Sequence, residues 1–247
     1  MMFALRLCAA VLVSLGLTAP VMAQDWEALD EDQVAEITGS ITTDFYHEMG
    51  HALIHVMDLP VLGNEEDAAD LLSVFMINEL WQEEPAQQIM SASLATWATM
   101  AETAMEEIDF WDEHAPSAKR LATMACLFYG ANPEARVDFA DEQGIPEERR
   151  EDCAVEWEPV YESWGVYFDE LIEAGPGETM VFVEPEEETP VTEAIRDEVE
   201  YFNSILTLPM DLVVSVEPCG MANAYFSPDD VAVVMCTELA DQVLERM

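Results

Sequence analysis

A change of hydrophobic periodicity at residues 174–177 separates two parts of this 247-residue chain. From residue 43 to about residue 171, apolar side chains recur at helical spacing, and the run 86–109 contains almost no glycine, proline or β-branched cluster. An Ala-Gly-Pro-Gly sequence then interrupts the pattern, and the apolar runs beyond it are short and bounded by turn residues. We therefore expect an α+β fold that is predominantly helical.

The part after this break is expected to form a small sheet around one helix. The helix is expected over residues 191–206, after an acidic loop that contains proline. Stretches with strand character occupy residues 180–183, 211–217, 223–226 and 231–236. The last three stretches follow one another closely, with a Ser-Pro-Asp-Asp turn between the final two. We therefore expect a mainly antiparallel sheet formed by the C-terminal segment.

The charge balance excludes several classes of partner. Asp and Glu number 52 against 8 Lys and Arg, which gives a formal net charge of −44. Such a field repels nucleic acid and anionic lipid, and no basic stripe reverses it locally. Hydrophobic residues still make up 51% of the chain, well above the level of disordered proteins. We expect a folded protein that binds no nucleic acid.

The first 23 residues have the features of a secretory signal peptide. They contain one arginine and an apolar stretch, with Val21 and Ala23 at the −3 and −1 positions of a cleavage site before Gln24. Acidic residues follow at once, whereas a membrane anchor needs about 20 apolar residues. We expect a periplasmic or secreted protein without membrane association after signal cleavage, whose mature chain is residues 24–247.

The cysteines predict two disulfides. Of the five cysteines, Cys8 is expected to leave with the signal peptide, and the mature chain keeps Cys126, Cys153, Cys219 and Cys236. An even number in an oxidising compartment favours two disulfides, and four cysteines allow three pairings. Proximity in the sequence favours Cys126 with Cys153 and Cys219 with Cys236. A zinc site built from all four is the alternative, but it lacks any Cys-x-x-Cys pair.

One short motif points to chemistry, because His47-Glu48-Met49-Gly50-His51 has the H-E-x-x-H pattern of zinc-dependent hydrolases. With His47 at 0° on a helix, His51 lies at about 40° and Glu48 at about 100°, so all three share one face. His55 is about 12 Å of rise from His47 and cannot close on the same ion. The opposite face of the helix is apolar and comprises Phe45, Met49, Ala52, Leu53 and Val56.

Zinc requires a third protein ligand, which we expect from the next helix. Asn64 is a good N-cap for that helix, and Glu66 and Asp70 lie one helical turn apart within it. We predict that Glu66 completes the zinc site and that Asp70 accepts the free ring N–H of a liganding histidine. Glu65 is the alternative ligand. The competing explanation is that these acids only complement the helix dipole.

Together these residues predict a hydrolytic mechanism. A zinc ion held by His47, His51 and Glu66 would polarise a scissile carbonyl and activate water. Glu48 would accept the proton of that water as general base and pass it to the leaving amine. An oxyanion donor is also required. The sequence does not distinguish among the candidates His114, Arg120, Tyr129 and Tyr225.

The same residues carry a resemblance. The H-E-x-x-H motif followed by Glu66 and Asp70 is similar to the gluzincin pattern of thermolysin-type enzymes. The sequence also resembles a family of exported bacterial metallopeptidase-like proteins. The matching stretches are 47–70, Asp112-Glu113-His114 leading to Arg120, Ala125-Cys126-Leu127, Tyr129-Gly130, Pro146-Glu147-Glu148-Arg149, Cys153, Ser163-Trp164, Leu208-Pro209, Cys219-Gly220 to Tyr225 and Cys236-Thr237-Glu238-Leu239. The resemblance implies a zincin-like catalytic core and zinc-dependent cleavage of a peptide or protein substrate.

The order of the segments differs from the family's usual one. The strand-rich stretch 177–239 follows the active-site helix here, where it would normally precede it, which indicates a circular permutation. Residues 237–247 would then lie near residues 25–37, and residues 24–247 would form one domain. In that domain a helical part, 24–177, would carry the zinc site, with a strand-rich part, 178–247, packed on it. The alternative is a partial second copy appended to the catalytic part.

Two hypotheses without catalysis remain beside the peptidase. An exported zinc-binding scaffold or inhibitor-like protein would keep the metal and cleave nothing. The presence of Glu48 disfavours it, because a structural zinc site does not need a base beside its ligands. An acidic protein that buffers divalent ions would need calcium-loop spacing, which is absent. The sequence leaves the oligomeric state open.

Overall fold

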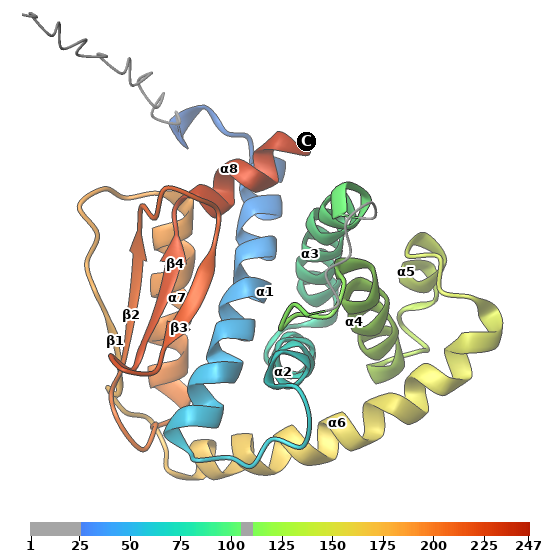
Figure 1. The fold of residues 1–247 in the computed structure, drawn as a ribbon, viewed down its shortest axis with the longest axis horizontal. Helices are drawn as coiled ribbons and strands as arrows, with labels where there is room; N and C mark the ends of the chain where they lie inside the picture. Colours follow the sequence, from blue (N-terminus) through green and yellow to red (C-terminus); the bar gives the residue numbers. More distant parts are fainter. Residues whose placement is uncertain (1–25, 105–110) are drawn as a thin grey trace, which may run out of the picture.

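The computed structural model of the protein describes residues 26–104 and 111–247. The expected signal peptide, Cys8 and the end of the expected run 86–109 lie outside these residues. The described chain is mostly helical and contains a four-stranded sheet in its C-terminal part (Figure 1). Within the described ranges, no helix is long and apolar enough to span a membrane.

The central element is helix α1, Glu31–Val56, which lies between the sheet with α7 on one side and α2 and α3 on the other (Figure 1). It begins at a capping box, in which Asp30 accepts a hydrogen bond from the Gln33 N–H and the Gln33 side chain accepts one from the Asp30 N–H. The predicted apolar face of α1 is buried, with Phe45, Met49, Ala52, Leu53 and Val56 each at most 5% exposed.

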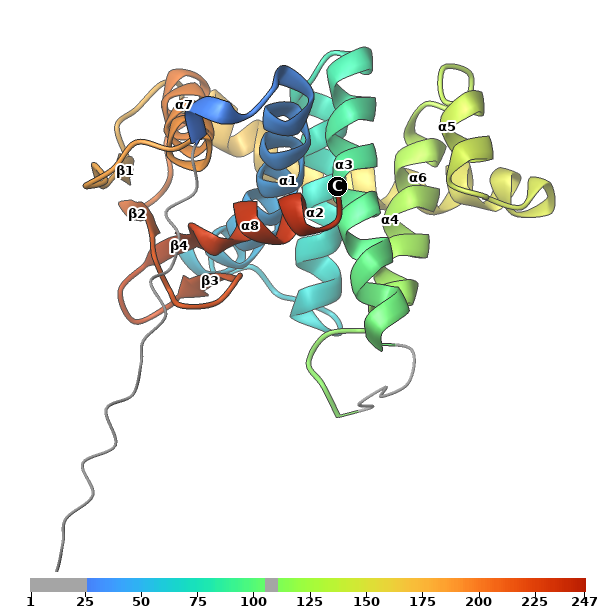
Figure 2. The same ribbon diagram turned by 90° about the horizontal axis from the view of Figure 1, so that it is seen from above.

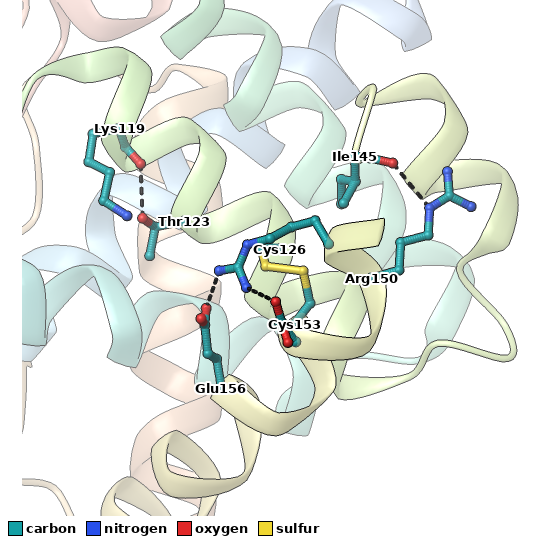
Figure 3. Close-up of a disulfide and its surroundings, with 9 residues drawn as sticks. Lys119, Thr123, Cys126, Ile145, Arg150, Cys153 and Glu156 are labelled. Atoms are coloured by element: carbon teal, nitrogen blue, oxygen red, sulfur yellow. Dashed lines mark hydrogen bonds and ion pairs between the residues drawn. A yellow bond between two sulfur atoms is a disulfide. The ribbon is translucent and has the colours of Figure 1, made fainter. Parts of the chain in front are cut away.

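Five further helices build the wall opposite the sheet. They are α2 (Glu65–Leu80), α3 (Glu83–Ala104), α4 (Ser117–Ala131), α5 (Val137–Glu142) and α6 (Glu147–Glu173). The long α6 packs against α2 and α4 (Figures 1 and 2). A disulfide between Cys126 and Cys153 joins α4 to α6 (Figure 3), as the spacing of the cysteines favoured. Gly130 allows this close packing, because a side chain there would collide with the backbone of Cys153.

The sheet has the strand order β1-β2-β4-β3 and is mostly parallel. Its strands are β1 (Met180–Phe182), β2 (Leu212–Glu217), β3 (Ala224–Ser227) and β4 (Ala232–Cys236). β1 pairs with β2 and β2 with β4 in parallel, and only β3 pairs with β4 in antiparallel fashion. The positions of the four strands were predicted correctly, but the expected antiparallel sheet was wrong.

Two physical reasons account for this topology. Helix α7, Pro190–Ile205, carries the chain back to the starting end of the sheet, so β1 and β2 run in the same direction. β4 is almost fully buried, whereas β3 is only partly covered. The more apolar strand therefore takes the central position beside β2, and β3 is left as the edge.

The C-terminal segment packs directly on α1. Strands β3 and β4 contact α1, and so does the last helix α8, Glu238–Glu245. Arg246 donates a hydrogen bond of 2.5 Å to Glu36, so the end of the chain lies beside the first turns of α1. A second disulfide, Cys219–Cys236, ties the loop after β2 to the end of β4.

A buried polar cluster holds α7 against α1. The Tyr46 hydroxyl donates a 2.7 Å hydrogen bond to Glu198 of α7 and accepts one of 3.0 Å from the Trp81 indole. Tyr46 has no exposed surface, and Glu198 is 7% exposed. Burial raises the pKa of Glu198 to about 7, although the hydrogen bond from Tyr46 opposes the shift.

We predict that Glu198→Gln removes a pH dependence of stability. The folded pKa of Glu198, about 7, lies above the ordinary value of 4.5, so folding favours the protonated acid. Its contribution to stability is present below pH 4.5 and is lost as the pH rises through 7. Denaturant unfolding should show the variant about equal to wild type at pH 4.5 and more stable at pH 8, by at most about 3 kcal/mol.

The matched control for this experiment is Glu200→Gln, which removes an exposed carboxylate from the same helix. The Glu200 variant should not reproduce the pH response of the Glu198 variant. An equal pH response of the two variants would contradict the assigned role of Glu198.

Candidate metal centre

Three side chains from α1 and α2 converge on one point. The Nε2 atoms of His47 and His51 are 3.3 Å apart, and the Glu66 Oε2 atom lies 3.1 Å from the first and 3.4 Å from the second. Ligands on a tetrahedral ion with bonds of 2.0–2.1 Å are separated by about 3.3 Å. The three residues therefore have both the donor types and the spacing to hold a metal ion.

A close helix contact places Glu66 over the histidines. Gly50 of α1 faces Ala69 of α2, and a Cβ on Gly50 would lie only 2.7 Å from the Ala69 Cα. The chain reverses between the two helices through Gly63, which has a positive φ of 135°. Asn64 then caps α2 by accepting a hydrogen bond from the Glu66 N–H, as predicted. The glycine within the motif thus permits the approach of the third donor.

The outer ring nitrogens of both histidines are held by carboxylates. His47 Nδ1 lies 2.9 Å from Asp70 Oδ1, and His51 Nδ1 lies 2.9 Å from Glu65 Oε1. These bonds leave both Nε2 atoms facing Glu66. Asp70 accepts two further bonds from Arg120 of α4, at 2.6 and 2.7 Å. Glu65, the alternative ligand in the sequence, therefore contacts the outer side of His51.

These carboxylates also set the protonation of the centre. Burial opposes a charge on His47, but hydrogen bonds with Asp70 and Glu66 prevail and raise its pKa to about 9. Burial also acts to raise the pKa of Glu66, yet hydrogen bonds with His114 and His47 hold it well below its ordinary value. A metal ion that binds here must displace protons from the imidazoles.

Glu48 lies beside this group and contacts the edge of the sheet. It is 8% exposed, and its carboxylate accepts a hydrogen bond from the backbone N–H of Phe226 in β3. Burial raises the pKa of Glu48, while the nearby His47 and His51 oppose the shift. A carboxyl group with a raised pKa next to a candidate metal site is suited to accept and return a proton.

Two hollows meet at these residues. One has a volume of about 420 Å³ and the other of about 650 Å³, and both are lined by His47, Glu48, His114, Asn223 and Ala224. The centre is therefore open to a ligand larger than water, between α1 and the β3 edge.

The structure separates the four candidate oxyanion donors. His114 Nε2 lies 2.9 Å from Glu66 Oε2, so this side chain reaches the centre. Tyr225 lines the larger hollow. Arg120 is bound behind His47 by Asp70, and Tyr129 lines neither hollow.

Two further polar residues of α1 differ in how well the sequence predicted them. His55 is exposed and rests against Phe226, so it does not join the group of three donors, as expected. Asp44 was not identified, although it lines the smaller hollow. On a helical wheel it falls at about 60°, between His51 and Glu48, and this angle was the available signal.

We predict that Gly50→Ala weakens the metal site and the fold together. The added methyl group would force α2 away from α1 and carry Glu66 with it. Overpacking of this kind costs about 1–3 kcal/mol, and zinc affinity in a chelator competition should fall about tenfold or more. Gly165→Ala in α6 is the control, because its Cβ would make ordinary contact at 3.9 Å with Phe75. A Gly50 variant with unchanged zinc affinity would refute the prediction.

We predict that Asp70→Asn reduces zinc affinity by about 10- to 100-fold, because His47 loses the carboxylate that orients its ring. The variant also leaves Arg120 buried without its ionic partner, so the metal-free chain should unfold more easily. Asp67→Asn, an exposed position in the same helix, should leave affinity and stability unchanged. Equal zinc affinities for the two variants would contradict the orienting role.

Comparison with known proteins agrees with this centre. A family described as "Putative metallopeptidase" matches the chain over residues 6–168 and 186–247, which is nearly its whole length. Searches among curated proteins and among solved structures find no match. The match covers the H-E-x-x-H helix, α2 and the strands that pack beside them. The chain therefore belongs to this metallopeptidase family.

Proposed function

We propose that the protein is an exported zinc-dependent metallopeptidase that hydrolyses peptide bonds. The observation that carries this proposal is the convergence of His47, His51 and Glu66 at tetrahedral spacing, with Glu48 beside them. These three residues would hold Zn²⁺. A bound zinc ion supplies a Lewis acid for the scissile carbonyl and lowers the pKa of water.

Glu48 is proposed to be the general base. It is bordered by both hollows, so a substrate in either one comes within its reach. Its raised pKa favours the transfer of a proton from water to the Glu48 carboxylate and the later transfer of that proton to the leaving amine. The hydrogen bond from Phe226 keeps the carboxylate directed to the strand edge along which a substrate would lie.

His114 is proposed to donate a hydrogen bond to the oxyanion. Its bond with Glu66, the largest influence on it, raises its pKa and favours the protonated, donating form. The ring also stacks on His47, with centroids 6.3 Å apart. Asp70 and Arg120 lie on the outer side of His47, where Asp70 contacts Nδ1 and they fix the orientation of the ring.

An extended peptide is proposed to bind along β3. This strand pairs only with β4 among the described strands, so its outer edge faces no other described strand, although its Phe226 N–H is bonded to Glu48. Residues of β3 and of the loop before it line both hollows. A zincin-like core, with the substrate between the active-site helix and a strand edge, fits this arrangement.

The proposed compartment is the periplasm or the medium. Both disulfides suit an oxidising environment, in which small exported domains keep such bonds. We propose that residues 1–23 direct export and that residues 24–247 act as one catalytic unit.

The decisive experiment is the metal content of the purified mature chain, measured by mass spectrometry. We predict one zinc per chain in wild type, in Glu48→Gln and in Glu65→Ala, and loss of zinc in Glu66→Ala. Wild type should also cleave a peptide library. Glu48→Gln should retain the metal while kcat falls by about 10²- to 10⁴-fold, the usual contribution of a general base.

The outcomes separate the candidate functions. Zinc loss in Glu65→Ala with zinc retained in Glu66→Ala would exchange the roles of these two acids. Stoichiometric zinc without cleavage by wild type would favour the non-catalytic scaffold. Absence of zinc from wild type would refute the metallopeptidase proposal.

A further inference from the structure

The smaller hollow contains a carboxylate that the proposed mechanism does not use. Asp44 lies on α1 one turn before Glu48 and lines the cavity of about 420 Å³. No hydrogen bond or ion pair to another described residue engages it, although it is only partly exposed. Burial of an ionised carboxylate destabilises the folded protein unless a counter-charge or a hydrogen-bond donor pairs with it.

The charges around this cavity leave Asp44 without a dedicated partner. Arg120 also lines the cavity, but its guanidinium is bound by Asp70 at 2.6 and 2.7 Å. His47 is bound by Asp70 and Glu66 in the same way. The other acids of the lining are Glu48 and Asp112. His114 lines the cavity as well, but its imidazole lies 2.9 Å from Glu66 and 3.4 Å from Asp112. Burial raises the pKa of Asp44 to about 7, although the nearby charges of His47 and Arg120 oppose the shift.

The rest of the wall is mostly apolar. Trp97 and Met100 of α3 and Leu239 of α8 border the cavity, and Trp97 and Leu239 are themselves almost fully buried. Lysine and arginine have long aliphatic stems that pack on such surfaces while the cationic end seeks an acid. An acid within a pocket next to the reacting groups is also how trypsin, a peptidase of another class, selects basic residues.

We propose that this cavity is a specificity pocket that receives a lysine or arginine side chain of the substrate, with Asp44 pairing its charge. The inference rests on the proposed function, since it assigns a substrate class to the same centre. Asp44 is a binding residue here and takes no part in proton transfer.

The test measures binding separately from cleavage. A set of alanine hexapeptides carries arginine at each position in turn, and a matched set carries citrulline, a neutral analogue of arginine. Calorimetry with zinc-loaded Glu48→Gln protein should give, for one position, binding about tenfold or more tighter for arginine than for citrulline. Adding Asp44→Asn should reduce this ratio to about one. Adding Asp32→Asn, an exposed acid on the same helix, should leave the ratio unchanged.

The Asp32 control separates a pocket from the general field of the protein. An equal effect of both substitutions, or no preference for arginine at any position, would overturn the pocket. Circular dichroism verifies the fold of Asp44→Asn, and Asp44→Ser provides a second variant without the charge.

Cleavage by zinc-loaded wild type then tests the proposed function by itself. Cleavage without preference for basic residues would leave the peptidase standing and refute the pocket. Selective binding of arginine peptides without cleavage would refute the peptidase and support the pocket.

Discussion

The contact of α1 and α2 at Gly50 and Ala69 is the constraint on which the centre depends. A histidine pair on one helix can offer two nitrogen atoms, but a third donor must come from another element. Glu66 and Asp70 lie on either side of Ala69 in α2, so the distance between the helices sets both of their bonds to His47. A motif position that looks unconstrained in the sequence thus determines whether the ligand set can form.

Behind this contact, the ionic chain from Arg120 through Asp70 to His47 crosses three helices. Each member is at most 9% exposed, so each would be costly without its partners. Arg120 is further enclosed because its guanidinium lies 3.8 Å from the centre of the Trp97 ring. The pairing of these buried charges is weak evidence for extra stability, but it fixes the tautomer and direction of His47. The main effect of these ionic contacts is therefore to hold the His47 ring in place at the candidate metal centre.

The sequence was sufficient where the controlling physics is local. The polar face of α1, the cap at Asn64 and the bounds of α7 and the strands all follow from spacing over a few residues. Strand order was not predicted, because pairing in a sheet is chosen over the whole segment and depends on which strand is most deeply buried. The strand-helix-strand pattern of β1, α7 and β2 is itself typical of parallel pairing between the two strands.

The same distinction applies to the centre. His47, His51, Glu66 and Asp70 are linked by helix geometry and two adjacent helices, so their proximity could be predicted. His114 reaches Glu66 from a loop more than forty residues further along the chain, and no periodicity specifies that return. Asp44 is different. The helical wheel already places it on the polar face of α1, but the cavity that it lines is formed by distant segments and could not be predicted from the sequence.

The arginines show how this chain tolerates its charge. Each arginine of the described residues pairs with a carboxylate, as in Arg136 with Glu83 and Arg246 with Glu36. Because strong cations are few, most of the acidic side chains remain without a counter-charge and repel one another. This field attracts any basic peptide from a distance and weakens with salt, but it does not distinguish one residue of that peptide from the next. Selectivity along a peptide requires a charge held at short range in an enclosed position, which is the setting of Asp44 and not of the acidic surface.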